Sequence, residues 1–327
     1  MKQGLLGLMM LLHSFLAAHA DPFFRELPKA ELHLHLGGAY PKSYLFSLAS
    51  NKQRETLENA LSSISNRIAY NEVFTVFEIV RQLVDTETKV QKGVEALCKE
   101  LKADNIAYVE IRTGLKDLGG GVESYLQAVL AGIEAEKSDR FTAKVLLSLQ
   151  RNSSLASARK TIDLAIKYQN RGVAGIDLSG DSTIGNVQAI QEELVRAKAA
   201  EIPFIVHMGE DPREQDQLLL LELLQPERIG HGVHLIPEAK AWILQKKIPL
   251  EVCLTSSVLV QMVQDLHEHP GIYMLRHGHP VIFCTDDPLL FSVSLSDELW
   301  RAHRFGGLSL EEITEANKRA FEYALKS

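Results

Sequence analysis

Short apolar runs alternate with amphipathic segments along most of the chain. In residues 122–136 and 186–200, apolar side chains return every three or four positions, which is typical of helices that pack on one face. Because strands that alternate with such helices form parallel sheets, the pattern predicts an α/β fold. The eight expected strands lie within residues 31–36, 107–113, 143–150, 173–180, 203–210, 228–235, 249–257 and 280–288.

Eight such units favour a closed (β/α)8 barrel of the TIM type, and an open, doubly wound sheet is the alternative. No G-x-G-x-x-G loop follows the first expected strand, as it does in open sheets that bind dinucleotides. No low-complexity linker or change in composition divides residues 21–327. We therefore expect one domain over residues 21–327.

The interval between the first two expected strands is longer than the others. It contains roughly 70 residues, too many for a plain connection. Val73, Val76, Phe77, Val80 and Val84 within it have helical spacing. This spacing predicts a helical insertion that serves either as a lid over the site or as an additional helix packed on the core.

Residues 1–20 have the three parts of a secretory signal peptide. Lys2 supplies a positive charge, residues 5–18 an apolar run, and Ala18 and Ala20 the small residues before a cleavage point. We expect cleavage after Ala20 and a secreted or periplasmic protein; a short N-terminal helix on a cytoplasmic protein is the alternative. No other segment reaches the roughly 18 uninterrupted apolar residues of a membrane span, so no stable span is expected.

Composition and charge exclude several classes of protein. The chain is 46% hydrophobic and 24% charged, as in an ordinary globular domain. Its net charge is −7 with both signs interspersed, so it lacks the basic stripe with which proteins bind a nucleic-acid polymer. Its cysteines, Cys98, Cys253 and Cys284, form no CxxC unit, so neither a disulfide framework nor a cysteine-rich zinc site is expected.

Polar residues gather where the expected strands end, which is where barrels of this kind place their active sites. His33 and His35 lie two apart on the first strand, so both imidazoles point to one face and the intervening leucines to the other. Each further position alone also fits a core histidine, a turn or a helix cap, but four strand ends together indicate a site. The further positions are His207, Glu210, His231, Asp286 and Asp287.

Three imidazoles and one carboxylate form a suitable ligand set for Zn²⁺, which can keep one position for water and lower its pKa toward neutrality. We expect one Zn²⁺ per chain. Glu210, His231 and Asp287 remain for proton transfer. The expected ligands are His33, His35, His207 and Asp286.

The chain resembles the adenosine deaminase family. Residues 27–36, LPKAELHLHL, are similar to the opening motif of the family, and the resemblance covers essentially everything after residue 20. Further motifs follow in the family order at residues 108–112, 175–181, 207–210, 228–232, 251–257 and 285–288.

The resemblance implies hydrolytic deamination of adenosine or 2′-deoxyadenosine to inosine or 2′-deoxyinosine plus ammonia, by a zinc-activated water. It implies that Glu210 protonates purine N1 and that His231, with Asp287, orients or deprotonates the water. By the same resemblance, Asp287 is expected to meet N7 and the backbone N–H of Gly180 to approach the ring. The positions implied to contact a small purine nucleoside are His35, Gly37, Gly180 and Asp287.

Two positions depart from the family pattern. Gly37, followed by Gly38, replaces the carboxylate that typical members use on the ribose 5′-hydroxyl, and Met208 replaces a small residue. Residues 108–113 and 253–257 look as much like the N6-methyl-AMP deaminase branch. With only Lys42 as a cation near the first motif, adenosine is the primary expectation, and N6-methyl-AMP or another 5′-substituted adenine nucleoside is the alternative.

Two readings outside this chemistry stay open. One is a barrel hydrolase that uses the same metal cage on a non-purine amide or ester; the other is a secreted binding protein without catalysis. The retention of every expected ligand and acid–base residue favours an enzyme. The other zinc deaminase design, with HxE and PCxxC signatures, lacks its cysteine pair here. The sequence leaves the oligomeric state open.

Overall fold

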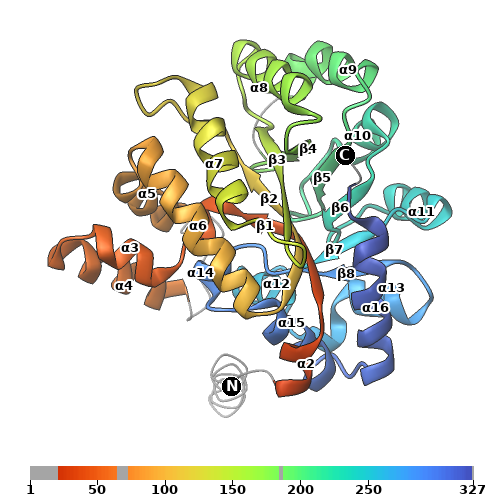
Figure 1. The fold of residues 1–327 in the computed structure, drawn as a ribbon. Coiled ribbons are helices and arrows are strands. Elements are labelled where there is room, and N and C mark those ends of the chain that lie inside the picture. The colour runs from red at the N-terminus through yellow and green to blue at the C-terminus, as the bar shows by residue number, and fades with distance from the viewer. Residues whose placement is uncertain (1–20, 65–72, 184–186, 326–327) are drawn as a thin grey trace.

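The computed structural model describes residues 21–64, 73–183 and 187–325, and the expected signal peptide lies outside them. Eight parallel strands form one sheet in sequence order, with helices around it (Figure 1). The strands are β1 (Lys29–His35), β2 (Ile106–Thr113), β3 (Thr142–Gln150), β4 (Val173–Ser179), β5 (Phe204–Met208), β6 (Arg228–His231), β7 (Leu250–Val252) and β8 (Val281–Phe283). The predicted (β/α)8 barrel is confirmed.

The helices follow the strands as the apolar periodicity predicts. The last two helices, Leu295–Arg304 and Leu310–Tyr323, begin at capping boxes. In each box, a serine side chain and a carboxylate three residues later accept hydrogen bonds from each other's backbone N–H groups. The helices are α2 (Pro22–Glu26), α3 (Lys42–Leu48), α4 (Asn51–Ile64), α5 (Val73–Leu83), α6 (Glu87–Ala103), α7 (Val122–Glu136), α8 (Leu155–Tyr168), α9 (Gln191–Ala199), α10 (Gln217–Leu224), α11 (Pro237–Lys246), α12 (Leu254–Leu259), α13 (Pro270–Arg276), α14 (Pro288–Phe291), α15 (Leu295–Arg304) and α16 (Leu310–Tyr323), with 3-10 turns η1 (Leu36–Gly38), η3 (Val187–Ile190) and η4 (Leu266–Glu268).

The barrel closes between β1 and β8 at the expected metal ligands. His35 N donates to Asp286 O at 2.9 Å, and Asp286 N donates to His33 O at 2.9 Å. Below this bridge, the buried carboxylate of Glu31 accepts hydrogen bonds from the backbone N (3.1 Å) and Oγ1 (2.8 Å) of Thr285. The same backbone that holds the ligands therefore closes the sheet.

The described part of the insertion between β1 and β2 contains η1 and α3 to α6 (Figure 1). Within it, α5 is the helix that the apolar spacing predicts. Val76 and Val80 are each 1% exposed, whereas Phe77 is half-buried and lines a cavity at the end of the barrel together with Val73 and Val80. The helix thus packs on the core and also covers the cavity, because its apolar stripe is wide enough for both.

Candidate active site

A cavity of about 460 Å³ opens at the carboxyl ends of the strands. Its wall includes all the predicted site residues except His33, which is fully buried beside it. A larger cavity, of about 1030 Å³, lies among α4, α6 and α14 and contains none of them. The predicted residues lining the smaller cavity are His35, Gly37, Gly180, His207, Glu210, His231, Asp286 and Asp287.

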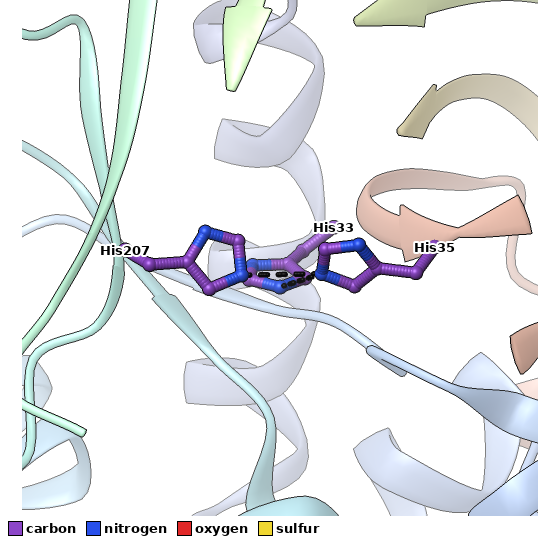
Figure 2. A group of neighbouring side chains, drawn as sticks. All are labelled: His33, His35 and His207. Carbon is purple, nitrogen blue, oxygen red and sulfur yellow. Dashed lines mark hydrogen bonds between the residues drawn. The ribbon is translucent and has the colours of Figure 1, made fainter. Parts of the chain in front are cut away.

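Three imidazoles converge on one point at the edge of this cavity (Figure 2). The Nε2 atom of His35 lies 3.2 Å from that of His33 and 3.1 Å from that of His207. Oδ1 of Asp286 is 3.4 Å from His33 Nε2 and 3.5 Å from His35 Nε2. The four predicted ligands are therefore brought together by β1, β5 and the end of β8.

The neighbours of these rings decide which nitrogen faces inward. Nδ1 of His33 lies 2.8 Å from Glu251 Oε2, and Nδ1 of His207 lies 2.9 Å from Asp177 Oδ1. A proton on each Nδ1 leaves the Nε2 lone pairs pointing at one another, an arrangement that a cation between them would stabilise. Ligands on a tetrahedral zinc, at their usual bond length, are roughly 3.3 Å apart. The donor set thus fits a zinc ion.

Cys253 also lies within ligand distance of His33 and Asp286. Burial raises the pKa of its thiol well above the ordinary value, which favours the neutral thiol over the thiolate that binds metals. Cys98, Cys253 and Cys284 are all buried free thiols, as their apolar surroundings in the sequence suggest for the last two.

One buried arginine joins the two carboxylates behind the histidines. Arg112 donates to Asp177 Oδ1 at 2.9 Å and to the backbone carbonyl of Leu32 at 2.9 Å, and it also bonds Glu251. Arg112, Asp177 and Glu251 are fully buried. Sequence reasoning gave them no role; the signal it passed over was charged residues inside strands that are otherwise apolar.

Two non-glycine residues of the site have left-handed backbones. His231 has φ of 64° and Asp286 has φ of 65°, at the ends of β6 and β8. Such conformations cost on the order of 1–3 kcal/mol each and persist where surrounding contacts fix them. Here the fixing contacts include Gly232 N to Met208 O and Asp286 N to His33 O, each 2.9 Å. The strain is concentrated where side chains turn into the cavity.

Burial shifts the pKa values of the carboxyl groups and of the histidine among the acid–base residues in opposite directions. Burial raises the pKa of Glu210 to about 7 and raises that of Asp287 well above its usual range, with the charge of Asp286 adding to the second effect. Burial lowers the pKa of His231 well below its ordinary value. Glu210 and Asp287 can therefore hold protons at neutral pH, while His231, 3.5 Å from Glu210, is neutral there.

Three glycines of the site lie close to different side chains. A Cβ on Gly38 would lie 1.8 Å from Asp287 Oδ1, whereas a Cβ on Gly37 would lie 3.3 Å from Phe77 Cδ1. Gly180 has φ of 92°, and a Cβ there would lie 2.4 Å from Gln150 Oε1. Gly38 makes room for the carboxyl of Asp287, and Gly37 faces the covering helix.

The expectation that Lys42 is the cation beside the first motif is wrong. Lys42 lines the other cavity and lies 3.4 Å from Glu58. Of the cations that line the site, Arg112 is paired with buried carboxylates, and the other two are Arg81 of α5 and Lys116 after β2. They are distant from Gly37 in sequence and are brought to it only by the pairing of β1 with β2 and the packing of α5.

Comparison with known proteins agrees with this geometry. The family model described as adenosine deaminase matches residues 28–327. The chain belongs to the adenosine deaminase family. It is 32% identical to the N6-methyl-AMP deaminase of Danio rerio over 320 residues, covering 93% of this chain and 92% of that protein. It is 30% identical to an adenosine deaminase of Clostridium botulinum over 302 residues, covering 88% and 90%.

Among solved structures, Arabidopsis ADAL complexed with GMP superposes with a TM-score of 0.86 at 28% identity, covering 94% of this chain and 95% of that one. The resemblance seen in the sequence motifs is thereby confirmed, and the chain is a member of a deaminase family. None of the helices within the described ranges is long and apolar enough to cross a membrane.

Proposed function

We propose that this deaminase hydrolyses the exocyclic amine of adenine nucleoside 5′-monophosphates, with N6-methyl-AMP as the preferred substrate and IMP as the product. The name of the Danio rerio relative and the GMP complex of the Arabidopsis protein support a nucleotide in the site. The proposal replaces adenosine, the primary expectation from the sequence, with its alternative.

The observation that carries this choice is the charge at one end of the cavity. His35 pairs with Arg112 across β1 and β2, so Gly37 and Gly114, which follow these strands, emerge side by side. Lys116 lies just beyond and forms no salt bridge with any described residue. Arg81 lies one helical turn after Phe77, whose ring faces Gly37. With no carboxylate at residue 37, this end suits a phosphate dianion.

We propose that His33, His35, His207 and Asp286 hold one Zn²⁺, which when bound would make water acidic enough to lose a proton near neutral pH. Neutral His231 takes a proton from the attacking water. Glu210, protonated near pH 7, gives its proton to N1 and makes C6 more electrophilic.

Two further groups orient the ring in this proposal. Asp287 keeps its proton and donates it to N7, an acceptor in every adenine. The backbone N–H of Gly180, a residue without a side chain in the cavity wall, meets the six-membered ring.

The test is a comparison of kcat/KM for N6-methyl-AMP, AMP, N6-methyladenosine and adenosine with zinc-loaded protein, following IMP, inosine and the released amine. We expect the nucleotides to be preferred. Lys116→Met should raise KM for the nucleotides about 10-fold or more, because a hydrogen bond to a charged group contributes roughly 1.5–3 kcal/mol. Lys42→Met, in the other cavity, is the matched control and should change nothing.

Adenosine is the second candidate, and one contact favours it. Glu78 lines the same end of the cavity and pairs with Arg81, so it supplies a carboxylate that could accept the 5′-hydroxyl. The Clostridium botulinum relative is named an adenosine deaminase. This candidate would be selected if the enzyme preferred adenosine, if Glu78→Gln abolished that preference, and if Lys116→Met left it unchanged.

A further inference from the structure

A third, smaller cavity lies directly behind the proposed catalytic acid. It has a volume of about 170 Å³ and shares Glu210 and Val260 with the main cavity. The carboxyl of Glu210 is 8% exposed and accepts no hydrogen bond from the described residues. The two cavities thus meet at a buried acid whose nearest basic neighbour is His231, at 3.5 Å.

The walls of the small cavity indicate which edge of the purine faces it. In the proposed function Glu210 meets N1, whose ring neighbours are C2 and C6, and His231 acts on the water that attacks C6. His234, three residues after His231, and Val260 and Met262, which follow α12, line the small cavity. These three residues come from the segments after β6 and β7, whereas Asp181, Ser182, Asp211 and Pro212 in the same wall come from the segments after β4 and β5. Because His231, at the end of β6, acts on the water that attacks C6, we place C6 on the β6 side of Glu210.

We propose that this cavity receives the amine that leaves C6, and that Val260 and Met262 determine which N6 substituents the enzyme accepts. The inference rests on the proposed deaminase function but not on the identity of the 5′ group. Val260 and Met262 are each 9% exposed and present apolar surface, which suits a methyl group on the departing nitrogen.

The charge of the departing amine is complementary to the carboxylates in the wall of the small cavity. Water adds its oxygen to C6, one of its protons ends on N1 and the other on N6, and the C6–N6 bond breaks with its electron pair on nitrogen. N6-methyl-AMP and water thus give IMP and methylamine, which takes up a proton at neutral pH. A cation leaving this way meets the carboxylates of Asp181 and Asp211.

The histidine in the wall of the small cavity adds no positive charge that would repel the departing cation. Burial lowers the pKa of His234 below its ordinary value, so its ring is neutral at pH 7. Its backbone N donates to Gly209 O at 2.7 Å, which fixes this wall to the segment that carries Glu210. Asp211 is held on the outer side by Arg213, at 2.6 Å between Oδ2 and the guanidinium.

The experiment measures two ratios of kcat/KM in the zinc-loaded protein: N6-propyl over N6-methyl substrate, and N6-methyl over unsubstituted substrate. Met262→Ala should raise the first ratio about 10-fold, and Met262→Phe should lower the second by a similar factor, because one methylene in an apolar pocket changes discrimination by roughly 10-fold or more. Val263→Ala is the matched control, since Val263 is buried beside Met262 but lines neither cavity. It should leave both ratios unchanged.

The ratios are taken within whichever series the enzyme turns over, nucleosides or nucleotides, so an error in the proposed 5′ group does not affect them. Turnover of no member of the series would refute the proposed function. The inference is then tested by binding: the dissociation constants of the N6-propyl and N6-methyl compounds are measured by calorimetry, and their ratio replaces the first ratio of kcat/KM. Unchanged ratios in both Met262 variants would overturn the inference. So would a change in tolerance of 2-methyl substrates in place of N6-alkyl ones, because the cavity would then face C2.

Discussion

Oδ1 of Asp287 occupies the space that a side chain on Gly38 would need, with only 1.8 Å between that atom and a Cβ built on the glycine. We expect Gly38→Ala to displace the carboxyl from N7 and to lower kcat/KM at least 100-fold, as misplacement of a catalytic group does. Zinc content, measured by atomic absorption, should stay stoichiometric.

Gly37→Ala is the matched control for this variant. Its Cβ would lie 3.3 Å from the ring edge of Phe77, which can shift slightly, so turnover should largely persist. Equal losses in the two variants would show that Gly38 has no special relation to Asp287.

The pH profile should report the protonation of Glu210. Burial raises the pKa of this carboxyl from its ordinary 4.5 to about 7, and the proposed acid works only when protonated. We therefore expect kcat/KM to fall about 10-fold per pH unit above pH 7. Glu210→Gln should bind zinc, lose most turnover and lack this falling limb. A flat profile from pH 6 to pH 9 would refute the assignment.

Ser256 supports a metal ligand from α12. Its Oγ donates to Asp286 Oδ2 at 2.7 Å, so Ser256→Ala should weaken zinc binding about 10-fold, measured by competition with a chelator of known affinity. Ser257→Ala is the matched control, because this buried hydroxyl lies 3.1 Å from Nε2 of His269 and contacts no expected ligand. Equal zinc affinities in the two variants would argue against a role for Ser256.

Arg112 should be more important for folding than any surface arginine. Arg112→Met leaves Asp177 and Glu251 buried without their shared cation, and we expect it to lower the free energy of unfolding by about 3–5 kcal/mol. Arg319→Met removes an exposed pair with Glu315 and should cost less than about 1 kcal/mol. Urea denaturation of both variants measures the difference.

Export is a prediction that the fold leaves untested. Cleavage after Ala20 would leave Asp21 at the N-terminus, where its carboxylate accepts a hydrogen bond from Phe23 N at 2.9 Å and caps α2. Expression of the full chain in a bacterial host should give periplasmic protein whose N-terminal sequence begins at Asp21. Cytoplasmic protein that retains Met1 would support the alternative.

The sequence by itself determined the barrel and the gathering of its polar residues. Alternating apolar runs and amphipathic segments fixed the number and order of the strands, because the two periodicities differ. The spacing of His33 and His35 placed both imidazoles on one face of β1, and the position of His207, His231 and Asp286 at strand ends assigned them to one rim. These are local properties of the chain.

Only the tertiary structure decided what surrounds them. The link from Arg112 to Asp177 and Glu251, the fit of Asp287 against Gly38 and the left-handed backbones at His231 and Asp286 join segments far apart in sequence. The cations at the 5′ end are a similar case: Lys116 and Arg81 reach the site through strand register and helix packing, which local periodicity does not specify. Substrate preference depends on such long-range contacts, and so the sequence left it open.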